Sequence, residues 1–165
     1  VATIYVLKFW RYIMIITNVD NNDLESIFSL QECVFKEEPL LTGLDYFNQV
    51  TSLDDLKACF EKYDFLKAVD DDGSISGLIC AKENNHTVSI MAVMVKKERR
   101  NKGIGRKLVF AVEHLYSGIR CEIQTPDTMP KNIAFYESMG YSVCKKENNT
   151  KGEQIITFEK LREIH

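Results

Sequence analysis

The clearest succession of structural signals in this sequence is Val93-Met94-Val95-Lys96-Lys97-Glu98-Arg99-Arg100-Asn101-Lys102-Gly103-Ile104-Gly105. It opens as an apolar, β-rich segment, passes through a basic turn after Val95 and reaches two glycines. Apolar residues then recur at helical spacing, which predicts a helix over residues 103–116; they are Ile104, Leu108, Ala111, Val112 and Leu115. The stretch therefore predicts a strand, a glycine turn and a helix N-terminus in direct succession.

This succession is typical of an anion site. The first-turn amides of a helix have no intrahelical partner, and the helix dipole adds partial positive charge there. Gly103 and Gly105 would let a phosphate approach the backbone, because no Cβ stands in the way. Seven cations lie within twelve residues of a chain whose net charge is −3, which favours an anion site over a solvated charged face; they are Lys96, Lys97, Arg99, Arg100, Lys102, Arg106 and Lys107.

The spacing of the glycines argues against two common phosphate ligands. A dinucleotide turn would read GxGxxG and a triphosphate loop GxxxxGK[ST], and neither pattern is present. The pattern is instead Arg-x-x-Gly-x-Gly, from Arg100 to Gly105. So short a pattern could also be a plain helix-opening turn. It resembles the GCN5-related N-acetyltransferase (GNAT) superfamily, in which this turn wraps the coenzyme A pyrophosphate, largely through backbone amides.

A second motif, Ala134-Phe135-Tyr136-Glu137-Ser138-Met139-Gly140-Tyr141, resembles the C-terminal motif of the same family. The resemblance implies that Tyr136 donates a proton to the leaving coenzyme thiolate; the alternative is a core tyrosine. Many members carry Asn seven residues before this tyrosine, where this chain has Met129. Asn132 either takes over that coenzyme contact or only caps the helix.

The resemblance implies an N-acetyltransferase that moves the acetyl group of acetyl-CoA onto an amine by direct attack in a ternary complex, without a metal. The strand before the glycine turn would carry a bulge, with the Val93 amide polarising the thioester carbonyl and Val95 contacting the pantetheine arm. The coenzyme-binding residues expected by position are Val93, Met94, Val95, Arg100, Asn101, Lys102, Gly103, Ile104, Gly105, Arg106 and Asn132.

Two parts of the chemistry stay open at this point. Some relatives carry a glutamate that would serve as the general base where this chain has Ser89. The candidates for the base in this chain are therefore His86, Glu122 and a water chain. The acceptor, a small-molecule or peptide amine, would be held by segment 36–50. That segment is either an amine-binding loop or a solvated acidic loop; its candidate side chains are Glu37, Glu38, Asp45, Tyr46 and Phe47.

Length and composition predict a single domain over residues 1–165 with a core of its own. A pI near 5.7 argues against a non-specific nucleic-acid partner. Five cysteines, odd in number and widely spaced, favour reduced thiols and a cytoplasmic protein. Lys8 and Arg11 interrupt the apolar N-terminus, so neither a signal peptide nor a membrane span is expected. Residues 1–11 are either a leader or an extra strand.

The remaining patterns predict an α/β protein with a central mixed, mostly antiparallel sheet flanked by helices, in the order β-α-α-β-β-β-α-β-α-β-β. Asn22 and Glu25 would form the capping box of the first helix. The strand–helix–strand passage after Val95 allows one parallel pair. Besides an active enzyme, a non-catalytic acyl-CoA-binding or regulatory module and a nucleotide binder remain open, as does a homodimer.

Overall fold

The computed structural model describes residues 5–9, 12–37 and 50–161. The strands are β1 (Tyr5–Phe9), β2 (Tyr12–Asn18), β3 (Asp64–Val69), β4 (Ile75–Asn84), β5 (Thr87–Val95), β6 (Arg120–Pro126), β7 (Ser142–Asn148) and β8 (Gln154–Lys160). The α-helices are α1 (Leu24–Glu37), α3 (Leu53–Lys62), α4 (Ile104–Leu115) and α5 (Pro130–Ser138), with short 3₁₀ turns η1 (Asn21–Asp23) and η3 (Lys97–Arg99).

The strands form one sheet in the order β1-β2-β3-β4-β5-β6-β8-β7. Every neighbouring pair is antiparallel except β5 and β6, which are parallel and joined through α4. This confirms the mixed, mostly antiparallel sheet, and one pair among the described strands is parallel, as the strand–helix–strand passage after Val95 allowed. The strand β1 lies within residues 1–11, for which the sequence allowed either a leader or an extra strand.

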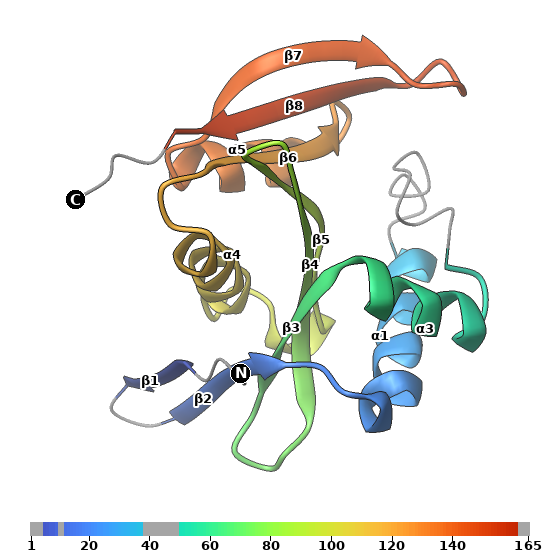
Figure 1. Ribbon diagram of the computed structural model, residues 1–165, viewed down its shortest axis with the longest axis vertical. Helices are drawn as coiled ribbons and strands as arrows, with labels where there is room; N and C mark the ends of the chain where they lie inside the picture. Colours follow the sequence, from blue (N-terminus) through green and yellow to red (C-terminus); the bar gives the residue numbers. More distant parts are fainter. Residues whose placement is uncertain (1–4, 10–11, 38–49, 162–165) are drawn as a thin grey trace.

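Helices cover both faces of the sheet, with α1 and α3 on one face and α4 on the other (Figure 1). The alternation of side chains along β4 explains how one sheet serves two cores. Leu78 and Cys80 belong to the core under α1 and α3, whereas Ile79 and Ala81 belong to the core under α4 and α5.

A bulge in β5 reverses this alternation where the site begins. Cys80 pairs with Ala92 and Ala81 pairs with Ile90, which leaves Met91 as the extra residue. Before the bulge Ile90 faces the α4 core; after it Ala92 and Met94 face the α1 core instead. Because an extra residue shifts the two-residue period by one, Val93 and Val95 turn toward α4.

The parallel strands β5 and β6 separate beyond this bulge. They pair only from Thr87 to Ile90 with Arg120 to Ile123, while β6 continues beside β8 as far as Pro126. The second half of β5 therefore keeps its ladder with β4 and has no ladder on the β6 side. The separation leaves a gap in the sheet, and backbone groups on that edge of β5 can bind a ligand.

Three helix ends carry residue types that are usual at such positions, and a fourth differs from the prediction made from the sequence. Ser52 caps α3, Pro130 stands in the first turn of α5, and Gly140 follows α5 with a φ of 86°. The prediction of a capping box at Asn22 and Glu25 was wrong. The box is formed by Asp20 and Asp23 around η1, because a 3₁₀ turn precedes α1 and moves the start of the helical segment two residues earlier.

Candidate functional site

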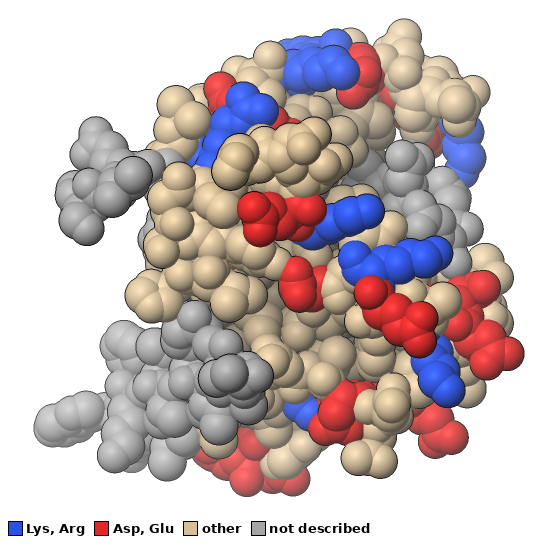
Figure 2. Space-filling model, in the orientation of Figure 1, with Lys and Arg blue, Asp and Glu red and all other residues tan. Residues whose placement is uncertain are grey.

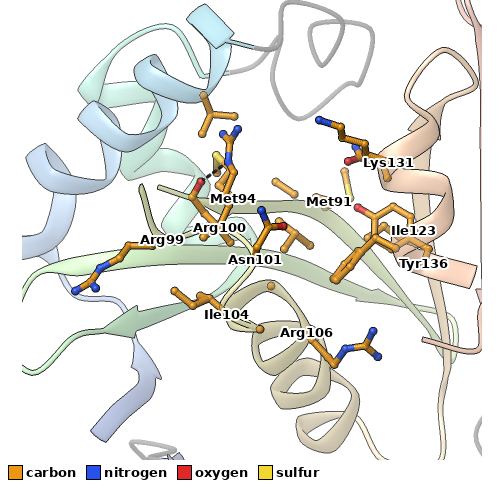
Figure 3. A pocket seen from close by; sticks show the side chains of 18 of the residues that line it. Met91, Met94, Arg99, Arg100, Asn101, Ile104, Arg106, Ile123, Lys131 and Tyr136 are labelled. Carbon is orange, nitrogen blue, oxygen red and sulfur yellow. Dashed lines mark hydrogen bonds between the residues drawn. The ribbon is translucent and has the colours of Figure 1, made fainter. Parts of the chain in front are cut away.

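A cavity of about 380 Å³ lies where β5 and β6 separate. Its walls come from the second half of β5, the turn after it, the first turn of α4, the end of β6 and one side of α5 (Figure 3). Two elements that the sequence singled out separately, the glycine turn and the α5 motif, thus meet at one cavity.

The turn before α4 presents backbone amides to this cavity. Asn101 and Gly103 both have positive φ, 62° and 76°, and Gly103 is the N-cap of α4 without a side-chain capping bond. The first helical hydrogen bond runs from the Lys107 N–H to the Gly103 carbonyl at 3.1 Å. The amides that precede Lys107 in the first turn have no such partner in the helix. Three of these residues, Ile104, Gly105 and Arg106, line the cavity.

The two glycines are needed for different reasons. A Cβ on Gly103 would meet no atom within 4 Å, so the space beside it is open and its φ of 76° is the constraint. A Cβ on Gly105 would lie 3.4 Å from Phe135 Cζ and 3.8 Å from Val95 Cγ2. Gly105 therefore lets the start of α4 pack closely against α5 and β5.

The free edge of β5 also presents amides to the gap. The Lys96 N–H donates to the Ser76 carbonyl on the β4 side at 2.9 Å. Because backbone groups alternate along an extended strand, the amides of Val93 and Val95 point away from β4, toward the side that β6 has left. This orientation suits the roles that the family resemblance assigned to them.

The arginines at the cavity are held by other groups. Arg100 donates from Nε to the Val95 carbonyl at 3.1 Å and from Nη2 to Glu37 at 2.8 Å. Arg106 donates to the Ser138 hydroxyl at 2.8 Å, and Arg99 pairs with Asp70. These contacts brace α1, α4 and α5 around the cavity.

Not every predicted cation lies at the site. All the predicted coenzyme-binding residues line the cavity except Lys102, which is exposed in the turn and outside the cavity wall. The turn curves so that Asn101 and Gly103 face inward and Lys102 faces solvent. Lys97, also outside the wall, pairs with Glu37 at 3.4 Å. Part of the cation cluster therefore has a bracing or solvated role.

Tyr136 lies on the α5 wall with its ring buried and its hydroxyl pointing into the cavity (Figure 3). Phe135, Tyr141 and Phe158 pack around the ring with centroids 5.3, 6.3 and 5.9 Å away. The neighbouring Tyr141 is turned elsewhere: its hydroxyl donates to the fully buried Glu113 at 3.0 Å. Burial, reinforced by the Glu113 charge, raises the pKa of Tyr141, which keeps it a donor.

Asn132 lines the cavity, and its amide donates to the Thr125 hydroxyl at 3.3 Å, so α5 is tied to β6. Neither of the two candidate base residues, His86 and Glu122, lines the cavity. His86 is exposed in the β4–β5 turn at a φ of 60°, and Ser89 lies beside Glu122 in the β5–β6 ladder.

In the segment predicted to hold the acceptor, Glu37 forms ion pairs with Lys97 and Arg100. Residues 38–49 of that segment lie outside the described part of the chain.

The sequence reasoning missed Lys131, Phe135 and Gln124, which also line the cavity. Phe135 and Lys131 are four residues apart on α5, so the helical period could have placed both on one face. Gln124 could have been predicted from the alternation of polar and apolar residues along β6, where it is an exposed position near the end of the strand.

A small cluster on β6, β7 and β8 brings ligand atoms of Glu122, Cys144 and Glu159 within 4.8 Å of one another. Arg120 pairs with both carboxylates, at 2.8 and 3.3 Å. Burial and the neighbouring Glu159 and Glu122 raise the pKa of the Cys144 thiol, which disfavours the thiolate that a metal would need. The guanidinium of Arg120 thus already offsets negative charge of the two carboxylates in this cluster.

The described surface carries acidic and basic side chains side by side on the face in view, without a broad basic stripe there (Figure 2). Among the described helices, none has both the length and the apolar character needed to cross a membrane.

Comparison with known proteins agrees with this geometry. The model of the acetyltransferase (GNAT) family matches residues 24–141, which include the glycine turn and the α5 motif. No curated protein matches this chain.

Solved structures share the fold at low identity. The ribosomal-protein-S18-alanine N-acetyltransferase of Escherichia coli is 15% identical with a TM-score of 0.72, over 92% of this chain and 96% of that one. The PaiA N-acetyltransferase of Thermoplasma acidophilum, in complex with coenzyme A, is 19% identical with a TM-score of 0.72, over 90% and 98%. The spermidine N-acetyltransferase of Vibrio cholerae, in complex with CoA and spermine, is 15% identical with a TM-score of 0.73, over 90% and 95%. On its sequence motifs, its fold and the match over most of its length, this chain belongs to the acetyltransferase (GNAT) family.

Proposed function

We propose that the protein is an N-acetyltransferase that binds acetyl-CoA in the cavity between β5, α4 and α5 and transfers the acetyl group to an amine. One observation carries the proposal: the first-turn amides of α4, the free edge of β5 and the Tyr136 hydroxyl all face the same cavity. Structures of two family relatives that contain coenzyme A support the choice of ligand.

The coenzyme would lie along β5. Its pyrophosphate would accept hydrogen bonds from the amides at Gly103 to Arg106, where the dipole of α4 adds positive charge. Its pantetheine arm would pair with the Val95 backbone, and the thioester would reach the bulge at Met91 to Val93.

The reaction would then be a direct transfer. The neutral amine attacks the thioester carbon, and the Val93 amide stabilises the developing oxyanion. The carbon–sulfur bond breaks and the sulfur takes a proton from the Tyr136 hydroxyl. The amine loses its proton to water, and water returns a proton to the Tyr136 phenolate. Holding both reactants in one cavity supplies much of the rate. As no candidate base lines the described cavity wall, a water chain is the proposed route for that proton.

The test is a screen of amine acceptors that follows coenzyme A thiol release and confirms the acetylated product by its mass. The proposal expects product from at least one class among small amines, amino acids and peptide N-termini. Binding of acetyl-CoA without transfer to any of them would favour the alternative, a non-catalytic acyl-CoA-binding module on the same fold.

The proposed location is the cytoplasm. All five cysteines are described, and all are free thiols in the structure, as a reducing compartment would keep them. Cell fractionation tests this, and recovery of disulfide-linked protein from an oxidising compartment would contradict it.

A further inference from the structure

The charged residues of the described cavity wall are all basic: Arg99, Arg100, Arg106 and Lys131, with no Asp or Glu among the described lining residues. The three arginines have partners in Asp70, Glu37 and Ser138. Lys131 has no ion pair or hydrogen bond from its ammonium to any described residue, and its side chain is exposed at the mouth of the cavity. Among the described lining residues, Lys131 is therefore the cation whose charged group is not already held by a partner and that can bind a ligand.

Lys131 lies at the reacting end of the cavity rather than at the phosphate end. Figure 3 shows it far from Arg106, toward Met91 and Tyr136. Val95 and Met91 are four residues apart on an extended strand, which separates the two ends by roughly 13 Å. Lys131 precedes Tyr136 by five residues, roughly 7.5 Å along the helix axis. The Tyr136 side chain leans toward the helix N-terminus, and thus toward Lys131.

We propose that Lys131 is a specificity-determining residue that selects acceptors with a carboxylate close to the reacting amine, as in a free α-amino acid. This inference rests on the proposed function. A carboxylate beside the amine can pair with the Lys131 ammonium while the amine reaches the thioester. A second ammonium in the same place, as a polyamine would bring, is disfavoured by like-charge repulsion. Selection of this kind works as much by rejecting the wrong acceptor as by binding the right one.

The experiment uses matched acceptors: phenylalanine and phenethylamine, and alanine and ethylamine, which differ by the carboxylate, with spermidine as a polycation. Steady-state acetyl transfer gives kcat/KM for each. The wild type should favour the amino acid of each pair by tenfold or more. Lys131→Met should bring the ratio near one, and Lys131→Glu should invert it toward the amines and spermidine. Lys57→Glu is the control, because Lys57 is exposed on α3 and does not line the cavity; it should keep the wild-type ratio.

The affinity for acetyl-CoA, measured by calorimetry, should stay within about threefold of the wild type in Lys131→Met. Preference of the wild type for the amines, or an unchanged ratio in Lys131→Met, would overturn the inference. So would failure to bind or acetylate any of the amino acids while acetyl-CoA still binds, a result that leaves the coenzyme site standing. A protein that does not bind acetyl-CoA fails at the proposed function instead.

Discussion

The role of the glycine turn can be separated from its backbone strain by comparing two glycines. Gly103 and Gly152 have nearly the same φ, 76° and 81°, and a Cβ would meet no atom within 4 Å at either position. Gly103 lines the cavity, whereas Gly152 lies in the turn between β7 and β8. Gly103→Ala and Gly152→Ala therefore impose the same strain, and only the first adds an atom at the proposed phosphate position.

The expected stability loss is about 1 kcal/mol in both variants, because an alanine is disfavoured in the left-handed region. For a domain of this size that lowers Tm by roughly 2–4 °C. The coenzyme affinity should differ. A methyl group in the cradle displaces the phosphate from first-turn amides, and each hydrogen bond to a charged group is worth about 1.5–3 kcal/mol. Losing one such bond weakens binding by roughly 10- to 150-fold.

Calorimetry and thermal unfolding measure the two effects separately. At acetyl-CoA a hundredfold above the wild-type Kd, the ligand stabilises the wild type and Gly152→Ala by about 2.7 kcal/mol. In Gly103→Ala the stabilisation should fall to about 1.4 kcal/mol or less. If both variants bind acetyl-CoA as tightly as the wild type, the turn at Gly103 does not hold the phosphate and only starts the helix.

Three further predictions concern Gly105 and Tyr136 at the cavity wall and Tyr141 in the core beside them. Gly105→Val should weaken acetyl-CoA binding by at least tenfold in calorimetry with an unchanged far-UV spectrum, since its branched side chain meets Phe135; wild-type affinity would contradict the close packing at this wall. Tyr136→Phe should slow single-turnover acetyl transfer by about 100-fold or more with near-normal acetyl-CoA affinity, and a wild-type rate would remove Tyr136 from the mechanism. Tyr141→Phe should lower the free energy of unfolding in urea by about 1.5–3 kcal/mol, because the buried Glu113 loses a donor, while kcat stays within twofold; a large kcat loss would show that Tyr141 acts in the chemistry.

Local signals explain why the elements could be predicted from the sequence. Apolar residues at helical spacing follow Gly103, which predicts a helix there. Pro130 favours the first turn of a helix and Gly140 the position just after one, so neighbouring residues alone predict α5. The pair Asn84-Asn85 indicates a turn between two strands in the same way, and the structure has this turn one residue later, at Asn85 and His86. The capping box was misplaced by two residues because Asp20, Asn22 and Asp23 are all good capping residues, and only the observed turn distinguishes them.

Long-range geometry explains what the sequence could not supply. The bulge at Met91 follows from how β5 pairs with β4, and the residues around it carry no bulge signal of their own. Asn101 lines the cavity and Lys102 does not, in a turn where Asn101 and Gly103 both have positive φ, and the residue pattern alone does not distinguish the two side chains. Lys131 enters the site only because α5 packs beside the gap between β5 and β6, which no local pattern predicts.

Every step of the proposed reaction requires that the cavity at the start of α4 binds acetyl-CoA, and a calorimetric titration measures this binding. We expect saturable binding of acetyl-CoA and of CoA with one site per chain, and weak or undetectable binding of ATP and NAD. No measurable affinity for acetyl-CoA, or equal affinity for ATP, would contradict this expectation.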